Sequence, residues 1–130
     1  MARRAAHGST PIPPSWPRAP DSLGGSDWPV STPDPIAAAH VAVNRRMPAA
    51  LADGDYDPFL PEQALDLATV LPAYTAGGAW VNHLDDGGRI SEGALADLVV
   101  LDRDPFLGPP EMIADATVIA TYVEGNQVHP

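Results

Sequence analysis

The sequence predicts an α/β protein with a helical middle and a β-rich end, and three observations lead to this prediction. Prolines crowd the first thirty residues, where six of the 16 prolines fall between Pro11 and Pro29. Apolar residues then recur at helical spacing between about residues 35 and 80, and β-branched runs with a hairpin signal fill the rest. The 130 residues suit one domain or parts of two, and a hydrophobic content of 45% allows a core.

Residues 1–21 are expected to form an irregular lead-in. Each proline fixes the backbone angle φ and removes a hydrogen-bond donor, which disfavours both helices and central strands. Arg3 and Arg4 stand near the start, but no apolar run follows them, so the segment is not typical of a secretory signal.

A first helix is predicted over about residues 35–46. Asp34 is suited to the N-cap, and Pro35 to the first helical position, where its missing N–H is not needed. Arg45 and Arg46 are expected in the last turn, where positive charge favours the helix dipole.

Residues 49–60 are acidic and are expected to form a surface loop. Asp53, Asp55 and Asp57 alternate as calcium ligands do in the first half of an EF-hand loop. The twelfth position, which carries a glutamate in that motif, is Ala64. A solvated loop therefore explains these acids better than a calcium site.

A second helical stretch is predicted over about residues 62–80. Pro72 lies inside it and is expected to kink the helix or to split it in two. Gly77 and Gly78 are expected to end the helix or to let another backbone approach closely.

The β-rich end contains several strand signals. A short strand is predicted around Arg89–Ser91, and the apolar run Ala96–Leu101 predicts a buried strand because of its β-branched valines. Thr117–Val123 and Gln127–His129 predict a hairpin that turns through Gly125 and Asn126.

Other polar residues are expected to be structural. His40 lies on the apolar side of the first helix and is expected to pack there. His83 precedes Asp85 and Asp86 in an acidic turn, where a metal is the alternative reading. Asp97 is expected to bind neighbouring backbone where its strand begins.

Composition limits the classes of partner and compartment. The net charge is −10, with 17 acids against seven arginines and no lysine, so binding to nucleic acid or to an anionic membrane surface is disfavoured. Cysteine is absent, which excludes disulfides and thiolate metal sites. No stretch approaches the ~20 apolar residues that a membrane helix needs. A soluble, cytoplasmic protein is therefore expected.

Three pieces of sequence, taken in order, resemble a known family. They are "GSDWPV" at residues 25–30, "AYT" at residues 73–75, and "GRISEGALADLVVLDRDP" from Gly88, followed by a T-x-V-x-G-x-x-V hairpin from Thr121. The third is the most specific, because "EGALADLVVLD" resembles the E-G-K-x-A-D-x-V-V-L-D signature. Over about residues 22–129 the chain resembles the C-terminal part of the metal-dependent amidohydrolases, specifically amidohydrolase family 3 with its YtcJ-like members.

The resemblance implies an architecture. Residues 22–86 would supply the last strand, at "GSDWPV", and the closing helices of a (β/α)8 barrel. Residues 87–130 would supply the C-terminal half of a β-sandwich domain beside it.

The resemblance also implies a chemistry, namely hydrolysis of carbon–nitrogen bonds other than peptide bonds by a metal-activated water. Asp27 matches the acid at the end of the last barrel strand, where it acts as general base and then as general acid, with possible metal contact. Ser26 and Trp28 would flank the substrate pocket. The family implies a divalent metal, zinc, and a small amide- or imide-type substrate.

Two readings of the function remain open. A catalytic zinc site takes three protein ligands, but this chain has only four histidines and no H-x-H pair. The chain is therefore either part of a hydrolase, completed by a longer protein, a homologous barrel chain or an oligomer, or an inactive remnant or binding module. By itself it is expected to bind no metal and to lack activity. With half of each domain missing, the sandwich strands and the first helix are expected to expose apolar faces.

Overall fold

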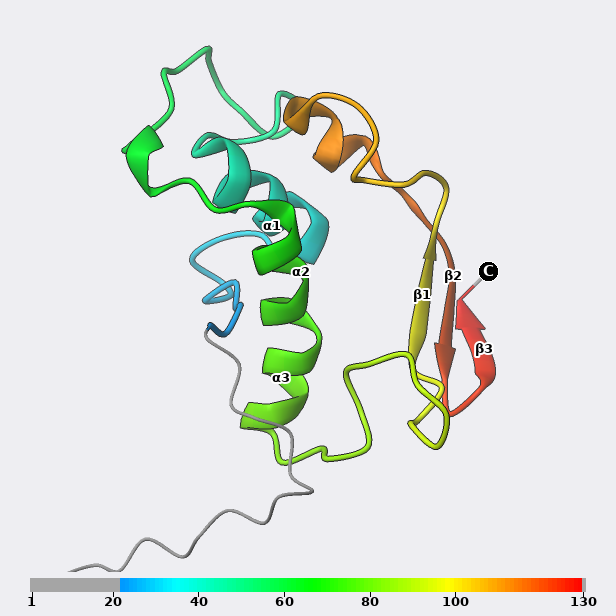
Figure 1. The fold of residues 1–130 in the computed structure, drawn as a ribbon. Helices are drawn as coiled ribbons and strands as arrows, with labels where there is room; N and C mark the ends of the chain where they lie inside the picture. Colours follow the sequence, from blue (N-terminus) through cyan, green and yellow to red (C-terminus); the bar gives the residue numbers. More distant parts are fainter. Residues whose placement is uncertain (1–21, 130) are drawn as a thin grey trace, which may run out of the picture.

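The structure, a computed structural model, describes residues 22–129. Helices lie on one side of the molecule and a three-stranded sheet on the other (Figure 1). Within this range the elements follow in the order α1 (Pro35–Asn44), η1 (Pro61–Gln63), α2 (Leu67–Tyr74), α3 (Ala76–Val81), β1 (Leu98–Leu101), η2 (Pro110–Asp115), β2 (Val118–Val123) and β3 (Asn126–His129), where η denotes a 3-10 helix. The chain is thus a small α/β structure, and the predicted lead-in over residues 1–21 lies outside the described residues.

Helix α1 begins where the sequence predicts and ends earlier. The Asp34 carboxylate accepts a hydrogen bond from the backbone N–H of Ile36 at 2.9 Å, and Pro35 opens the helix. The predicted end at residue 46 is wrong, because Arg45 caps the helix in the left-handed conformation at φ 55°. The Arg45 backbone leaves the helix to pair with the loop: Phe59 N–H donates to its carbonyl at 2.7 Å. The two arginines therefore follow the last turn instead of forming it.

The second helical stretch is divided differently from the prediction. Residues 62–66 do not continue the helix, since Asp66 caps α2 by accepting from Thr69 N–H at 2.7 Å. Pro72 lies inside α2, and the break comes later, at Thr75, between α2 and α3. Gly77 allows a close backbone approach as predicted, because a Cβ there would lie 2.8 Å from the carbonyl oxygen of Ser22.

The sheet has the order β1-β2-β3, and both pairings are antiparallel. The β2–β3 hairpin forms as predicted, but its turn lies one residue earlier, at Glu124 and Gly125, with φ angles of 50° and 79°. Two consecutive positive φ angles match the right-handed twist of the flanking strands. The strand predicted around Arg89–Ser91 is not formed, because nothing in the described sheet pairs with it.

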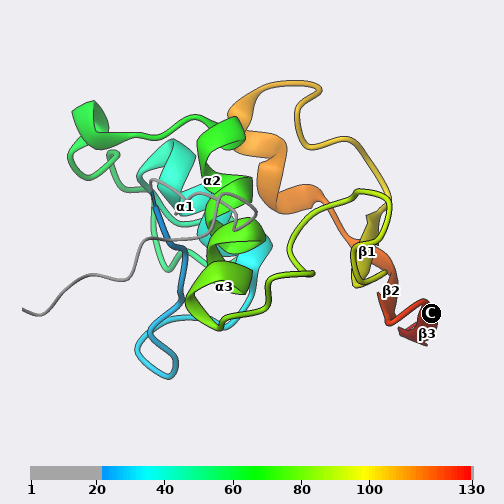
Figure 2. The ribbon, with the colours of Figure 1, turned by 60° about the horizontal axis from the view of Figure 1, so that its bottom comes forward.

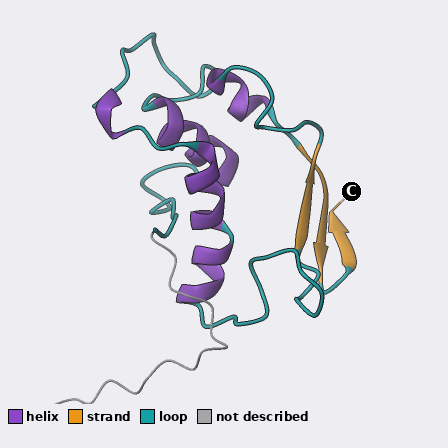
Figure 3. Ribbon diagram, in the orientation of Figure 1, coloured by secondary structure: helices purple, strands orange, loops and turns teal. Residues whose placement is uncertain are grey.

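The helices and the sheet lie on different sides of the molecule (Figure 3), and the two sides differ in how far their side chains are buried. The core lies among the helices and η2, where Ala39, Leu67, Val70 and Ile113 form one buried cluster. The prediction of a buried strand at β1 is wrong, because Val99 is 55% exposed. Apolar side chains are exposed on the strands, as expected. The expected apolar exposure of the first helix is wrong, because no residue of α1 beyond Pro35 is strongly exposed.

The segment η2 joins the two sides. It packs against α1 and contributes Ile113 to the helical cluster, and Figure 2 shows its chain running on into β2. The strand expected at "GSDWPV" does not form, since residues 22–34 are turns and irregular backbone without a neighbouring strand. Within the described part of the chain, no helix is both long and apolar enough to cross a bilayer.

Candidate functional site

The segment that carries Asp27 is fastened to α2. Gly24 N–H donates to the carbonyl of Ala73 at 3.0 Å, and the Tyr74 hydroxyl donates to the carbonyl of Gly25 at 3.5 Å. A Cβ at Gly24 would lie 2.5 Å from the Tyr74 ring, so only glycine fits in this conformation. The sequence thus holds the "GSDWPV" segment in place by backbone contacts.

Asp27 stands at the tip of this segment and is exposed. Its backbone is left-handed at φ 52°, which aspartate tolerates better than most residues, and its carbonyl accepts from Val30 N–H at 2.9 Å. Among the residues described, no hydrogen bond reaches the Asp27 carboxylate. The carboxylate is therefore free to contact a ligand and does not act as a local turn cap.

The other two predicted pocket residues do not gather around Asp27. Ser26 is half-buried and lines a hollow of about 280 Å³ together with Thr32, Ala38 and Tyr74. Trp28 is 65% exposed and lines neither this hollow nor the larger one described below.

The described residues do not fit a metal ion by themselves. Over residues 22–129, no three His, Asp or Glu side chains lie where they could hold one together. Asp27 supplies one carboxylate, whereas a catalytic zinc takes three protein ligands. The acidic loop with Asp53, Asp55 and Asp57 is exposed, in agreement with the solvated loop that the sequence predicts.

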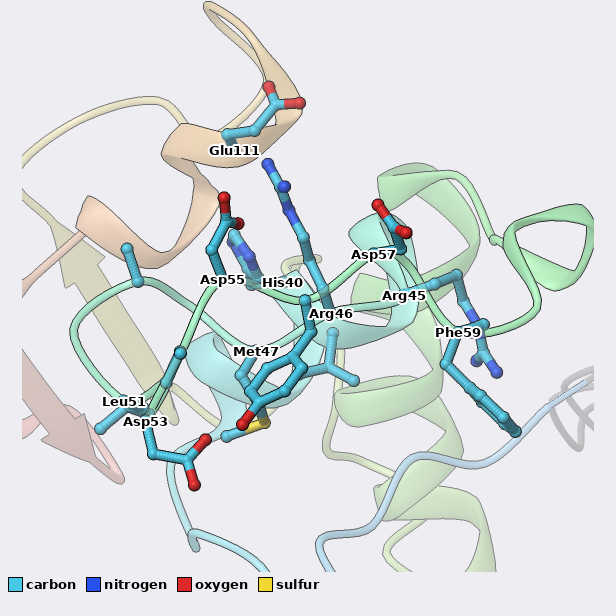
Figure 4. Close-up of a pocket in the computed structure, with 15 residues that line it drawn as sticks. His40, Arg45, Arg46, Met47, Leu51, Asp53, Asp55, Asp57, Phe59 and Glu111 are labelled. Carbon is cyan, nitrogen blue, oxygen red and sulfur yellow. The ribbon is translucent and has the colours of Figure 1, made fainter.

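A larger hollow of about 850 Å³ lies beside the C-terminal end of α1 (Figure 4). Its lining combines apolar and charged side chains, contributed by α1, by the loop over residues 45–59 and by η2. They include His40, Arg46, Met47, Asp55, Tyr56 and Glu111. The sequence analysis did not predict this hollow. The loop is folded back by the hydrogen bond from Phe59 N–H to the Arg45 carbonyl, and a contact between residues so far apart leaves no local pattern in the sequence.

His40 is buried, as the sequence predicts, with 3% of its surface exposed. Burial lowers the pKa of its imidazole first of all, and Arg46 lowers it further, against opposing effects of Glu111 and Asp115. The ring is therefore neutral around neutral pH.

Two acids of the β-rich end act through backbone hydrogen bonds. The Asp97 carboxylate accepts from Glu124 N–H at 2.8 Å, which confirms its predicted structural role. The Asp102 carboxylate accepts from Thr117 N–H at 2.8 Å and pairs with Arg103 at 2.9 Å. The Arg103 and Thr117 donors lower the pKa of Asp102 to about 2.

Comparison with known proteins gives three relatives. The chain is 35% identical over 109 residues to Protein LONG AFTER FAR-RED 3 of Arabidopsis thaliana, covering 82% of this chain and 17% of that protein. It is 29% identical over 107 residues to the putative amidohydrolase YtcJ of Bacillus subtilis (strain 168), covering 82% and 20%. It is 31% identical over 100 residues to the N-substituted formamide deformylase of Arthrobacter pascens, covering 77% and 18%.

The chain therefore spans about a fifth or less of the length of the curated relatives it matches, between 17% and 20%. No solved structure matches it. The family described as "Amidohydrolase family" matches residues 3–129, so the match begins earlier than the expected residue 22 and includes most of the proline-rich lead-in. This match spans nearly the whole sequence, and the chain belongs to the amidohydrolase family.

Proposed function

We propose that this chain forms part of a metal-dependent hydrolase that breaks carbon–nitrogen bonds other than peptide bonds in small amide- or imide-type substrates. The family match over residues 3–129 carries the proposal. One relative, 31% identical, is named an N-substituted formamide deformylase. Removing a formyl group from a formamide breaks a carbon–nitrogen bond of this class.

Asp27 is the catalytic residue that we assign to this chain. Its carboxylate is exposed at the tip of a segment that α2 holds in place. In hydrolysis of an amide, it would take a proton from the attacking water and return it to the leaving nitrogen. Ser26 and Trp28 flank it in sequence and are proposed to border the substrate.

The family's divalent metal, zinc in this proposal, would be held chiefly by ligands from outside residues 22–129, with the Asp27 carboxylate as the contact that this chain supplies. The remaining barrel strands and the other half of the sandwich would come from a longer protein, a homologous barrel chain or an oligomer. The exposed valines of the sheet support this, because Val99 and Val100 are neighbours in one strand, lie on opposite faces of the sheet and are both exposed.

The second candidate is an inactive remnant or binding module. It is favoured by the lack of a group of metal-ligating side chains over residues 22–129. The two candidates differ in whether the segment around Asp27 still functions when a complete barrel surrounds it.

A chimera tests this difference. Residues 22–129 replace the segment of the Arthrobacter pascens deformylase that this chain matches, and hydrolysis of an N-substituted formamide is measured. An active chimera is expected, and Asp27→Asn should lower kcat by about 10²–10⁴-fold, as expected for loss of a general acid–base. Asp34→Asn is the matched control, because asparagine also caps helices well and Asp34 lies only seven residues further on.

A folded, metal-loaded chimera without activity would support the remnant. Equal activity of Asp27→Asn and Asp34→Asn would remove Asp27 from the mechanism while leaving the reaction class intact.

A further inference from the structure

The larger hollow lies beside the C-terminal end of α1, whereas Asp27 precedes the first residue of that helix and does not line it. Its volume of about 850 Å³ falls within the range of pockets that hold small organic molecules. In the loop that walls it, Phe59 N–H donates to the Arg45 carbonyl at 2.7 Å. A turn within the loop is closed by Leu51 N–H, which donates to the Pro48 carbonyl at 2.9 Å. Backbone hydrogen bonds therefore fix the shape of this wall.

Acids dominate the charge of the hollow. Its lining has four carboxylates and two guanidiniums, those of Asp53, Asp55, Asp57, Glu111, Arg45 and Arg46. Arg45 is partly engaged, because its Nε–H donates to the Phe59 carbonyl at 3.1 Å. Among the residues described, no ion pair joins these acids to either arginine. The excess of negative charge is therefore not neutralised within residues 22–129, and it favours a cation in the hollow.

His40 adds a buried polar group to the same hollow. Its side chain lines the hollow, and only 3% of the residue is exposed. Its Nδ1 atom is shielded from solvent and has no hydrogen-bond partner within residues 22–129, whereas buried polar atoms are paired in the great majority of cases. In Figure 4 the ring points towards the side of the hollow where Asp55 and Glu111 stand. A neutral imidazole accepts at its bare nitrogen, so an N–H donor of a bound molecule would satisfy it.

Apolar side chains form much of the remaining lining. Met47, Leu51, Tyr56 and Phe59 all line the hollow and are between 44% and 71% exposed. The Tyr56 ring folds back on the loop, since a Cβ at Gly54 would lie 3.1 Å from it. An aromatic face beside carboxylates suits an organic cation, because the ring attracts positive charge while apolar surface covers the body of the molecule.

We propose that the larger hollow binds a small organic cation, an ammonium group on an aromatic body, with the ammonium at Asp55, Glu111 and His40 and the body on Met47 and Tyr56. An anion would be repelled by the carboxylates, and a neutral molecule would leave them without a partner. A metal ion is not favoured, because in the described part of the chain no three His, Asp or Glu side chains lie where they could hold one. The site does not depend on the proposed hydrolase activity.

Three probes of similar size and different charge test the site: the cation 2-phenylethylamine, the neutral 2-phenylethanol and the anion 3-phenylpropionate. Each is titrated near neutral pH into the isotope-labelled 130-residue chain, and binding is followed by nuclear magnetic resonance. We expect the amine to shift the signals of the His40 ring and of residues 45–59. It should bind about fivefold more tightly than the alcohol, the gain from one exposed ion pair, and the anion should not bind.

Four results would overturn the proposal. They are no binding of the amine, equal affinity for the amine and the alcohol, binding of the anion, and binding of the amine that leaves the His40 ring unchanged.

Two variants in the exposed loop sharpen the test, and neither touches the buried cluster. Asp55→Asn should weaken binding of the amine by about two- to fivefold and leave that of the alcohol unchanged. Tyr56→Ala should weaken binding of both, because it removes the ring that covers their common body. Glu92→Gln is the matched control, since it removes a like charge from an exposed turn outside the hollow. An equal loss in Asp55→Asn and Glu92→Gln would mean that the amine responds only to the net charge of −10, which contradicts a site.

Discussion

The helices of this chain bury apolar side chains of the kind that its sheet leaves in solvent. Val70 on α2 is 2% exposed and belongs to a cluster with Leu67 and Ile113, whereas Val99 on β1 is 55% exposed and Val128 on β3 is 60% exposed. Both regions have similar side chains, so the difference lies in what covers them. The helices pack on one another and on η2, while the sheet is a single layer. The three strands are held to one another by backbone pairing and by the hydrogen bonds of Asp97 and Asp102, while most of their side chains are not buried.

The largest contrast is expected at two glycines with positive φ. A Cβ at Gly88 would lie 2.7 Å from the Cβ of Ala79 and 2.8 Å from the carbonyl oxygen of Thr75, whereas Gly93 has nothing within 4 Å. Gly88→Ala should cost about 3 kcal/mol, from overpacking and from the left-handed backbone together. Gly93→Ala should cost about 1 kcal/mol, from the backbone alone. Urea unfolding measures both costs. Equal costs would mean that the close approach of Gly88 to Ala79 and Thr75 does not add to the cost of the left-handed backbone.

Matched valine truncations compare the two regions directly. Val70→Ala should destabilise the fold by about 2 kcal/mol, because it removes buried methyl groups and leaves a cavity. Val99→Ala should change the free energy of unfolding by less than about 0.5 kcal/mol, as is usual for exposed positions. Urea unfolding of the isolated chain measures these changes. A large cost at Val99 in this chain would show that the sheet is covered in solution by another layer.

Local signals explain how much of the fold could be predicted. Asp34 with Pro35 marks the start of α1, and the valines of β1 and β2 mark strands, because capping and β-branching act within a few residues. The burial of the strands could not be predicted from the sequence, since Val99 is exposed only because no second layer covers the described sheet. The expected strand around residues 89–91 failed for the same reason: a strand needs a partner.

In the candidate site, too, the features with a local sequence signal could be predicted and those made by distant contacts could not. The glycines before Asp27 indicate a tight turn, and the structure leaves this carboxylate exposed at its tip. The larger hollow with His40 depends on contacts between α1, the loop over residues 45–59 and η2, and distant contacts of this kind have no signature in one sequence.

The smallest expected effect concerns the acid that holds the β-rich end. The Asp102 carboxylate links the end of β1 to the residue before β2, through Thr117 N–H at 2.8 Å. Its pKa is lowered from 3.8 to about 2, first by Arg103 and then by Thr117. The folded state therefore binds this proton less readily than the unfolded chain, so the stabilisation is complete above pH 3.8 and is lost as the pH falls towards about 2.

Asp102→Asn should consequently be less stable than the wild type at pH 5, and the difference should shrink as the pH is lowered to about 2. Urea midpoints at several pH values measure this, with Glu92→Gln, in an exposed turn, as the control. No difference at any of these pH values would mean that the hydrogen bond to Thr117, which asparagine can also accept, matters and the charge does not. In that case the β-rich end would depend on backbone geometry alone, and its contrast with the buried helices would be sharper still.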